Sequence, residues 1–492
     1  MGSPGSTAAD GLAGRHERRH DMPLDIDKIM DQAVQAAREF SRLDQATTDR
    51  IVRAAYEAGF DARVDLAEMA VAETRLGVVA DKVIKNAIAT WLVHEDIRGL
   101  RTAGVIAEDH DHGIVEIAQP MGPIFAVTPI TNPTSTTLFK VLIALKSRNP
   151  LIIRPHGAAK KCSITAARIC YEAALAAGAP EHCIQWVKRS SQQETLDMMA
   201  HRKTALILAT GSVELVRAAH RSGTPTIGVG PGNVPAYIGK SADVPFAVEQ
   251  IVKSKTFDNG TVCASEQAVV IRALHAEQAH AEFARRGAYF VTGDEVGRLS
   301  EVAFNATQRI MRTEVIGQPA TRIAEMAGID VPPETTLLMA ELDDVGLHSP
   351  LSHEILAPIL ASYTAADLEH AIDLCRRINR HGGLGHTASI FSRNEAMIER
   401  FAEEMNAGRI LVNTPASQGA LGGTYNALQP SLTLGCGAGG KNITTDNISA
   451  RHLINIQRVA RRKVAARMES EVAHLLDPAF SARDLERDCN RG

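Results

Sequence analysis

Residues 124–154 read IFAVTPITNPTSTTLFKVLIALKSRNPLIIR, and the fold class follows from this stretch. Two short apolar runs, 124–127 and 151–154, are typical of buried strands, and the segment 134–145 between them has the spacing of a helix. Further helices and strands are expected in alternation at 162–177, 184–187, 192–199, 205–209 and 214–221. Such alternation indicates βαβ units and a mostly parallel sheet, which binds ligands at the carboxyl ends of its strands.

A second alternating set begins after Cys263, with elements expected at 268–271, 275–286, 289–291, 365–381, 388–391 and 410–412. Helical spacing also runs from residue 24 to about residue 100, and 113–118 alternates as a strand does. The sequence therefore predicts an α/β protein of two lobes, with the loop that carries Cys263 between them. The tail, 448–486, is rich in charge, and we expect a helix there that faces solvent or an oligomer partner.

The composition is that of a globular protein of 492 residues, with 45% apolar residues, 22% charged residues and a net charge of −4. The balanced charge and an aromatic content of 4% argue against nucleic-acid binding. No apolar run reaches the roughly 18 residues that a membrane-spanning helix requires. The seven cysteines are scattered without a CxxC pair, which favours a reduced cytoplasmic protein over a disulfide scaffold or a zinc module. Residues 1–22 are expected to form a disordered extension, with Met22 as an alternative start.

Two glycine-containing segments are candidates for phosphate binding. Residues 435–440, GCGAGG, fit the GxGxxG pattern, but no convincing helix follows them, so we interpret them as a loop. Residues 209–215, ATGSVEL, follow a predicted strand and open a predicted helix, so Thr210, Gly211 and Ser212 are candidates to hold a pyrophosphate. An ordinary turn, with Ser212 as the helix N-cap, is the alternative.

Cys263 lies within TFDNGTVCASEQAVV, residues 256–270, between the turn signal DNG and an apolar run. A packed, inert thiol is the default interpretation of a single cysteine. The alternative is a nucleophile held on a loop above a rigid scaffold, where catalytic residues often lie.

Six motifs resemble those of the CoA-acylating branch of the aldehyde dehydrogenase superfamily. They read PMGPIFAVTPITNPTST, ALKSRNPLIIRPH, GVGPGN, KTFDNGTVCASEQ, GHTASIF and NTPASQGALGG followed by PSLTLGCG. The resemblance covers about residues 30–460, and it is to the aldehyde dehydrogenase half of bifunctional aldehyde–alcohol dehydrogenases and to stand-alone acylating enzymes. It implies an aldehyde dehydrogenase fold, with a Rossmann-like cofactor-binding lobe, an α/β catalytic lobe and a small oligomerisation arm.

The resemblance also implies domain limits and an assembly. A cofactor-binding domain is expected at 23–240 and a catalytic domain at 241–430. A return segment, an oligomerisation strand and a C-terminal helix are expected at 431–492. The arm would pair a hairpin at 105–118 with a strand near 440–447, and a homodimer or homotetramer is expected.

By the same resemblance, Cys263 is the nucleophile that forms a thiohemiacetal and then an acyl thioester. Asn132 would stabilise the oxyanion together with the Cys263 backbone N–H, with a turn role before Pro133 as its alternative. Glu354 would bind the nicotinamide ribose. The further cofactor contacts that we expect are Thr128, Arg154, Pro155, His156, Thr210, Gly211, Ser212 and Gly230.

The segment 227–233, IGVGPGN, lacks the glutamate with which hydrolytic members of the superfamily activate water. A thiol would then outcompete water, so we expect CoA as a co-substrate beside the aldehyde, in a reversible reaction. His386, in GHTASIF, is expected near the CoA or the acyl group, or else as a structural histidine. Arg154, with Gly157 where hydrolytic enzymes place an acid, leaves both NAD and NADP open.

Two rival functions remain at this point. One is a hydrolytic aldehyde dehydrogenase with a relocated base, for which Glu214 or Glu266 would have to serve. The other is a catalytically silent scaffold of the same fold. Acetaldehyde or propionaldehyde is the default substrate, and sulfoacetaldehyde and succinate semialdehyde are the anionic alternatives. No metal is expected at the site.

Overall fold

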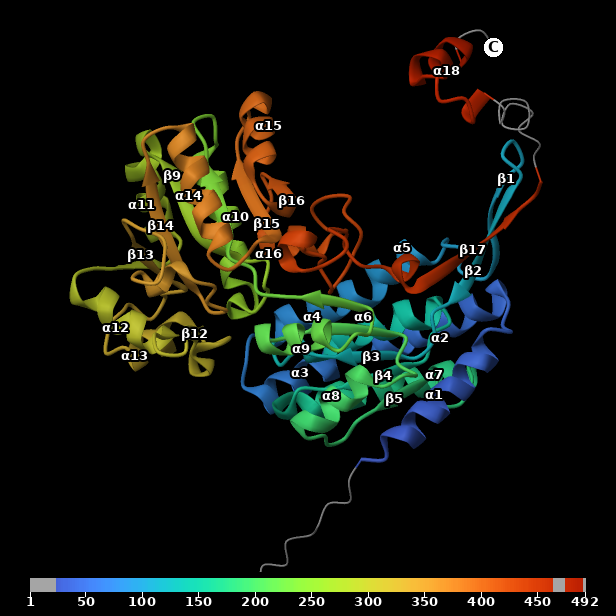
Figure 1. The fold of residues 1–492 in the computed structure, drawn as a ribbon. Helices are drawn as coiled ribbons and strands as arrows, with labels where there is room; N and C mark the ends of the chain where they lie inside the picture. Colours follow the sequence, from blue (N-terminus) through green and yellow to red (C-terminus); the bar gives the residue numbers. More distant parts are fainter. Residues whose placement is uncertain (1–23, 463–473, 490–492) are drawn as a thin grey trace, which may run out of the picture.

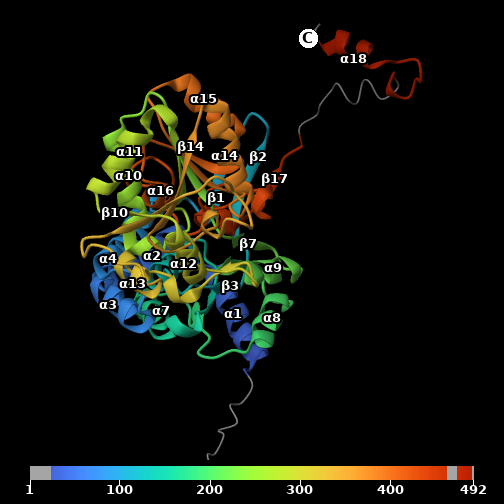
Figure 2. The ribbon, with the colours of Figure 1, turned by 90° about the vertical axis from the view of Figure 1, so that its left-hand side faces the viewer.

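The computed structural model describes residues 24–462 and 474–489. The predicted extension, 1–22, and the parts 463–473 and 490–492 of the expected C-terminal segment 431–492 lie outside the described residues. Figures 1 and 2 show two lobes, each built on a parallel sheet flanked by helices, and an antiparallel arm that extends from the first lobe. The predicted α/β fold class is therefore confirmed. Across the described residues, no helix combines the length and hydropathy that crossing a bilayer would take.

The sheet of the first lobe has the parallel strand order β5-β4-β3-β6-β7. These strands are β3 (Ile124–Val127), β4 (Leu151–Arg154), β5 (Ile184–Trp186), β6 (Leu206–Thr210) and β7 (Thr226–Val229). Ile124 and Ala126 pack on one face with α2 (Gln45–Asp61), α6 (Pro133–Lys146) and α7 (Lys160–Ala176). Phe125 and Val127 pack on the other face with α1 (Ile26–Phe40), α8 (Gln192–Ala200) and α9 (Val213–Arg221). Both faces are buried, which explains why these strands read as continuous apolar runs.

The sheet of the second lobe has the parallel order β10-β13-β14-β9-β8-β15-β16. These strands are β8 (Val234–Ile238), β9 (Glu266–Arg272), β10 (Ala288–Val291), β13 (Leu337–Glu341), β14 (Ile359–Ala365), β15 (Gly385–Phe391) and β16 (Ala407–Val412). One face is covered by α10 (Val244–Thr256) and α11 (Ala276–Arg285), and the other by α14 (Leu368–Arg380) and α15 (Glu395–Glu404). The chain passes between the two sheets at 230–233, which is earlier than the expected domain limit at 240.

The arm consists of β1 (Gly104–Asp109), β2 (Ile114–Pro120) and β17 (Ile454–Ala460). β1 and β2 form the hairpin expected at 105–118, but the third strand is not the one expected near 440–447. That segment closes on its own loop, since the Gly437 N–H donates to the Thr444 carbonyl at 2.8 Å.

β17 also corrects the prediction of a helix over 448–486. Each of its residues has a partner on β2, from Ile454 opposite Pro120 to Ala460 opposite Ile114, and this pairing fixes an extended backbone. Within the described part of the tail, Ala450–Leu453 forms a short 3-10 helix and α18 (Ala482–Cys489) is an α-helix.

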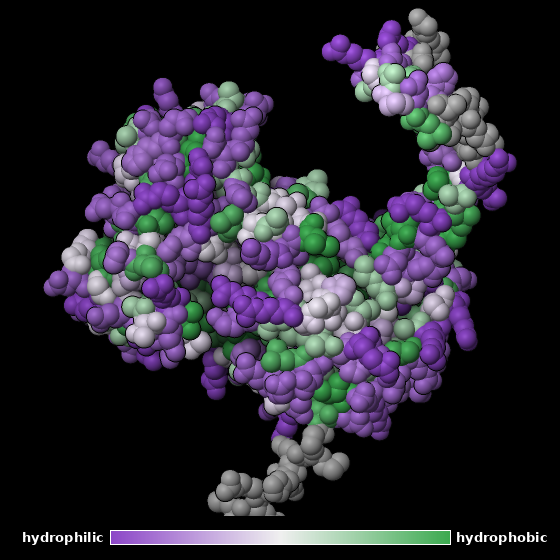
Figure 3. Space-filling model, in the orientation of Figure 1, coloured by the Kyte–Doolittle hydropathy of each residue, from purple (hydrophilic) through white to green (hydrophobic). Residues whose placement is uncertain are grey.

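Figure 3 shows hydrophilic side chains over most of one face, with hydrophobic side chains gathered along the arm and where it joins the first lobe. Ile456 and Val459 of β17 are among the exposed large apolar side chains. A three-stranded sheet that exposes apolar side chains has little core of its own, and such surfaces often contact another chain.

Candidate active site

Cys263 follows a tight turn between α10 and β9, and its side chain is half-buried. The turn passes through three consecutive left-handed residues, Asp258, Asn259 and Gly260, whose φ angles are +50°, +51° and +73°. Glycine adopts this conformation freely, whereas each of the other two residues stores roughly 1–3 kcal/mol of strain there. Such strain persists only where surrounding contacts hold the backbone in place.

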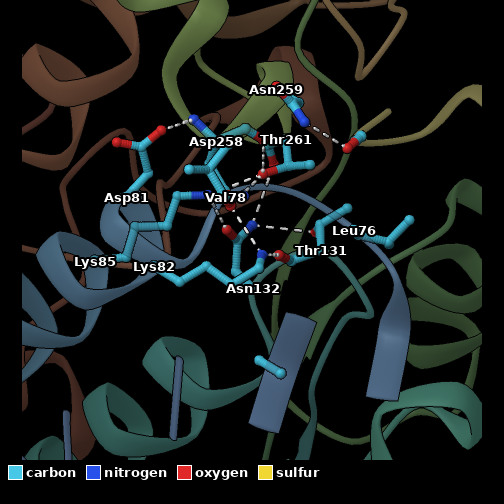
Figure 4. A network of polar contacts seen from close by, with 12 residues as sticks. Leu76, Val78, Asp81, Lys82, Lys85, Thr131, Asn132, Asp258, Asn259 and Thr261 are labelled. Atoms are coloured by element: carbon cyan, nitrogen blue, oxygen red, sulfur yellow. Dashed lines mark hydrogen bonds and ion pairs between the residues drawn. The ribbon is translucent and has the colours of Figure 1, made fainter. Parts of the chain in front are cut away.

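The contacts that hold this turn converge on Asp258, as Figure 4 shows. Its buried carboxylate accepts the Val78 N–H at 2.7 Å and the ammonium groups of Lys82 at 2.9 Å and Lys85 at 2.5 Å. Although burial opposes ionisation, the two lysines hold the pKa of Asp258 below its usual value. The turn is thereby tied to α4 (Val79–Ala87), a helix far away in sequence. Sequence reasoning took Asp258 for a turn signal and missed this network.

Cys263 opens onto a small cavity at the base of the turn. The cavity is lined by Lys85, Asn132, Thr136, Thr210, Val229, Val262, Cys263, Leu421, Leu432 and Leu434. The predicted nucleophile, the predicted oxyanion donor and one predicted cofactor contact thus lie around one space. Half of the lining side chains are aliphatic, so a small reacting group there would be largely shielded from water.

Asn132 is the N-cap residue of α6, but its side chain makes no capping hydrogen bond. Its Oδ1 instead accepts the Lys85 ammonium at 2.6 Å. Its Nδ2 donates to the Thr131 hydroxyl at 3.1 Å and to the Thr261 carbonyl at 3.3 Å. The turn role proposed as the alternative for Asn132 therefore does not account for its side chain, which faces the turn that carries Cys263.

The loop between the two sheets packs directly against Cys263. A Cβ atom built on Gly232 would lie 2.2 Å from the Cys263 carbonyl oxygen and 3.1 Å from the nearest atoms of the His386 ring. The Gly232 N–H donates to Glu354 Oε1 at 2.8 Å. Four residues from distant parts of the sequence therefore lie close together around this loop: Gly232, Cys263, Glu354 and His386.

The buried surroundings of Cys263 and Glu354 favour the neutral forms of both side chains. Burial raises the pKa of Glu354 to about 7. Burial, and then the charge of Glu354, raise the pKa of the Cys263 thiol to about 12. The nearby charge of Arg409 acts in the opposite direction but does not offset these two effects, so a thiolate at Cys263 requires further stabilisation.

His386 is the second residue of β15 and is fully buried. Its Nδ1 contacts the Thr387 hydroxyl at 3.0 Å, while its Nε2 has no hydrogen-bond partner among the described residues. Burial lowers the pKa of His386 to about 3, so its ring is neutral. The buried guanidinium of Arg409 donates to the carbonyls of His386 and Gly435, both at 2.7 Å.

This arginine also explains the GxGxxG segment at 435–440. The segment packs against the second lobe through Arg409 and forms a short 3-10 turn, Ala438–Gly440, with no α-helix after it. Its interpretation as a loop is confirmed, because a dinucleotide fingerprint requires a helix N-terminus at this position.

The strand order of the first sheet defines a crevice between the ends of β3 and β6, where the chain reverses its direction across the sheet. Thr128 follows β3, and its buried hydroxyl has no hydrogen-bond partner among the described residues. Lys140, a buried lysine that sequence reasoning missed, joins the two strands by donating to the Val127 carbonyl at 2.7 Å, to the Leu208 carbonyl at 3.0 Å and to the Thr210 hydroxyl at 3.1 Å. An unsatisfied hydroxyl at a switch point fits a bound dinucleotide, which would supply its missing partner.

Apart from Glu354, which precedes β14 in the second lobe, the other predicted cofactor residues lie along the same strand ends, outside the cavity of Cys263. Arg154 ends β4, with its Nε 3.4 Å from the Ser190 hydroxyl, and Pro155 and His156 follow it. Burial lowers the pKa of Arg154, and burial with the charge of Arg154 lowers the pKa of His156.

The α9 segment supports both interpretations proposed for it. Ser212 is the N-cap of α9 and accepts the Leu215 N–H at 3.3 Å, so its hydroxyl has a structural task. Gly211 precedes it, and Gly230 has open space where a side chain would stand. The N-terminus of α9 and the open space beside Gly230 leave room for a ligand at this edge.

Neither relocated base named for the hydrolytic alternative lines the cavity of Cys263. Glu214 is exposed in the first turn of α9. Glu266 is buried with its Oε1 accepting the Ala416 N–H at 2.9 Å, and burial raises its pKa to about 7.

Gly232 lies so close to Cys263 that an added Cβ must displace the Cys263 carbonyl. We therefore expect Gly232→Ala to lower kcat/KM for the aldehyde oxidation expected from the sequence by about tenfold or more. Steady-state kinetics of the purified variant measure the effect. Gly297→Ala in α12 (Asp294–Ala303) is the matched control, since a Cβ there meets no atom within 4 Å. Equal activity of the two variants would show that the loop yields easily at Gly232.

Comparison with known proteins identifies the family. Residues 19–426 match the model of the aldehyde dehydrogenase family, and the chain belongs to this family. A solved structure described as an acetylating aldehyde dehydrogenase from Geobacillus thermoglucosidasius is 42% identical, covers 89% of this chain and 96% of that chain, and superimposes with a TM-score of 0.87.

Two curated relatives extend the comparison. The bifunctional aldehyde-alcohol dehydrogenase AdhE of Escherichia coli K12 is 42% identical over 442 residues, which are 89% of this chain and 49% of that protein. The sulfoacetaldehyde dehydrogenase (acylating) of Cupriavidus necator is 38% identical, over 88% of each chain. The chain thus spans about half the length of the bifunctional relatives that it matches.

Proposed function

We propose that this chain is a CoA-acylating aldehyde dehydrogenase, which oxidises a short-chain aldehyde and transfers the acyl group to CoA. The observation that carries the proposal is that Cys263 and Asn132 share one cavity whose lining, within the described residues, includes no carboxylate. The names of the relatives from Geobacillus thermoglucosidasius and Cupriavidus necator support it.

The first step is the addition of the Cys263 sulfur to the aldehyde carbonyl, which gives a thiohemiacetal. The negative charge that develops on the carbonyl oxygen requires a fixed donor, and the Asn132 amide lines the same cavity. An oxidised nicotinamide carries a positive charge, and a cation beside a thiol lowers its pKa. Cofactor binding would therefore offset the effect of burial on Cys263.

In the second step the oxyanion form of the thiohemiacetal would re-form its C=O bond and expel hydride, which leaves an acyl thioester on Cys263. When bound, the nicotinamide supplies the hydride acceptor. The thiolate of CoA then attacks the acyl carbon, the bond to Cys263 breaks, and the Cys263 thiolate is regenerated. We place His386 near the acyl group, because its ring is neutral and its Nε2 is unpartnered.

The dinucleotide would lie in the crevice at Thr128 and Thr210, with Glu354 toward the nicotinamide ribose. Arg154 and His156 would lie toward the adenosine ribose, and Gly211, Ser212 and Gly230 toward the phosphates. Support comes from the Thr128 hydroxyl, which has no partner among the described residues, and from the position of all these residues except Glu354 at the carboxyl ends of the strands of the first sheet. These proposed contacts are compatible with both NAD and NADP.

If Arg154 contacts a 2′-phosphate, Arg154→Glu should lower the preference for NADP over NAD by about tenfold, because a carboxylate repels the phosphate. The measurement is the ratio of kcat/KM with the two cofactors. Arg298→Glu, an exposed change of the same charge in α12, controls for net charge. An unchanged ratio in Arg154→Glu would rule out the contact.

The cavity favours a small neutral aldehyde over an anionic one. Its aliphatic lining offers no charge partner to a carboxylate or sulfonate, and its single lysine, Lys85, already donates to Asp258, Asn132 and Thr261. A lysine ammonium has three N–H donors, so none remains for a substrate anion. We therefore propose acetaldehyde or propionaldehyde as the substrate class.

A hydrolytic route is the second candidate, and one observation favours it. Glu354 accepts the N–H of Gly232, the residue that packs against the Cys263 carbonyl, and burial raises the pKa of Glu354 to about 7, which suits a general base. If Glu354 activates water, Glu354→Gln will abolish the formation of free acid. If it binds the ribose, the variant will raise the KM for the cofactor and leave the product unchanged.

The test of the function is reduction of NAD and NADP by purified protein with propionaldehyde, with and without CoA, and with sulfoacetaldehyde in parallel. Turnover that requires CoA and yields propionyl-CoA supports the proposal. Equal turnover without CoA supports the hydrolytic route, and a lack of turnover with either aldehyde supports a silent scaffold. Faster turnover of sulfoacetaldehyde would reverse the proposed substrate class.

We also propose a homodimer or homotetramer that is assembled through the arm, on the basis of the exposed apolar side chains of β17. The scattered cysteines, which are free where the structure describes them, support a cytoplasmic location.

A further inference from the structure

Lys85 is a buried lysine to which the proposed reaction steps assign no role. It lies on α4, its side chain is 1% exposed, and it lines the cavity of Cys263. Its ammonium contacts three acceptors, Asp258 Oδ2 at 2.5 Å, Asn132 Oδ1 at 2.6 Å and Thr261 Oγ1 at 2.9 Å, as Figure 4 shows. Lys85 therefore links the oxyanion residue to the turn that carries the nucleophile.

The chemistry of an ammonium group makes this contact directional. A lysine ammonium donates hydrogen bonds and accepts none, so the atom of Asn132 that faces Lys85 must be the amide oxygen. The amide nitrogen must then face the opposite way, toward Thr131 and the Thr261 carbonyl. A primary amide has nearly the same shape when it is flipped by 180°, so its orientation depends on such a partner.

Without Lys85, two other states would compete with the productive one. A flipped Asn132 would present its oxygen, rather than its N–H, to the oxyanion, and the two negative oxygens would repel each other. Alternatively, Asn132 would cap α6, which is the usual role of an asparagine at a helix N-cap and one that this side chain does not fulfil here.

Lys82 provides an internal comparison. It lies three residues before Lys85, is also buried, and donates to the same Asp258 oxygen at 2.9 Å. Its other contact is the Thr131 carbonyl at 3.0 Å, and none of its hydrogen bonds in the described part of the chain reaches the Asn132 side chain. The two lysines thus share the structural task of neutralising Asp258, and Lys85 adds a contact to Asn132.

We propose that Lys85 is a positioning residue that holds the Asn132 amide with its nitrogen toward the turn that carries Cys263, an inference that rests on the proposed nucleophilic role of Cys263. The N–H that donates to the Thr261 carbonyl at 3.3 Å, the longer of its two hydrogen bonds, would turn to the oxyanion when the oxyanion forms. The carboxylate of Asp258 and the hydroxyl of Thr261 hold the ammonium in place. Lys85 acts through Asn132 and forms no bond to the substrate.

The test compares two reactions of the Cys263 thiol in the full-length protein without cofactor or CoA. Acylation by 4-nitrophenyl acetate passes through an oxyanion and releases nitrophenolate, whereas alkylation by iodoacetamide displaces iodide and forms no oxyanion. Because neither reaction uses CoA or an aldehyde, failure of the proposed overall function would leave this test intact. Loss of both reactions in Cys263→Ser verifies that they report on this thiol.

We expect Lys85→Met to slow acylation by about 10–100-fold while alkylation stays within about threefold of the unaltered protein. Lys82→Met, which removes the same charge from the same carboxylate, should change the ratio of the two rates by less than about threefold. In an Asn132→Ala background, Lys85→Met should slow acylation by less than about twofold further, because its target is absent.

The proposal would be overturned if acylation and alkylation fell together in Lys85→Met, or if the losses in Lys85→Met and Asn132→Ala multiplied in the double variant. Should Lys85→Met prove insoluble, Lys85→Gln serves in its place, since it removes the charge but keeps an N–H donor. For this variant we expect a smaller fall in acylation with unchanged alkylation, and a parallel fall in both rates would again overturn the proposal.

Discussion

Replacing Cys263 with serine should lower CoA-dependent oxidation of a short aldehyde at least about 10³-fold. A serine hydroxyl is a much weaker nucleophile in a site that offers no strong base, and Cys263 lies in a cavity without a lining carboxylate, among the residues described. The measurement is kcat/KM for propionaldehyde with saturating cofactor and CoA. The substitution should slow the addition to the aldehyde and leave cofactor binding intact. Fluorescence of the bound cofactor measures that binding.

The matched control for this variant is Cys436→Ser. Cys436 is a buried thiol in the 435–440 loop, and it does not line the cavity of Cys263. Its replacement should preserve the activity within a few-fold, as is usual for a small change of a packed residue. Substantial activity in Cys263→Ser, or a loss in Cys436→Ser of the same size, would contradict the assignment of the nucleophile.

Replacing Asn132 with alanine should lower kcat by about 10²–10³-fold, which corresponds to roughly 3–4 kcal/mol of transition-state stabilisation. The expected change in the KM for the aldehyde is small, because the oxyanion develops only in the transition state. Steady-state kinetics over a range of aldehyde concentrations separate the two parameters.

Asn132→Asp tests the donor role of Asn132 separately from its shape. It keeps the shape of the side chain and its contact with Lys85, but it replaces the amide N–H donor with a carboxylate oxygen. We expect a loss at least as large as in Asn132→Ala, because a negative oxygen would face the developing oxyanion. If Asn132→Asp retained most of the activity, the donor role would be excluded, and the packing of α6 would be the better explanation.

Much of the two-lobed fold was predictable, because each parallel strand is buried on both faces and therefore reads as a short apolar run. The strands predicted at 124–127 and 151–154 coincide with β3 and β4. The arm was not predictable in the same way. β17, INIQRVA, is mostly exposed and has no continuous apolar run, so its extended backbone depends on pairing with β2, which is distant in sequence.

The candidate site was predictable where a residue stands in a motif and was missed where a charge is buried. Cys263, Asn132 and Thr210 were named from their motifs and do surround one cavity. Lys85 and Lys140 were missed, because lysines on a helix are usually solvated. Lys140 did carry a signal, since it interrupts the apolar run 138–145 of α6 and so required buried acceptors.

The central claim is that the acyl thioester on Cys263 resists water and is released only when a thiol attacks it. Intact-mass spectrometry of the protein tests this claim most directly. Protein mixed with propionaldehyde and oxidised cofactor, but without CoA, should gain the mass of one propionyl group on Cys263 and then stop. Adding CoA should remove that mass and release propionyl-CoA. Protein that stays unmodified while free propionate accumulates at the full steady-state rate would contradict the account.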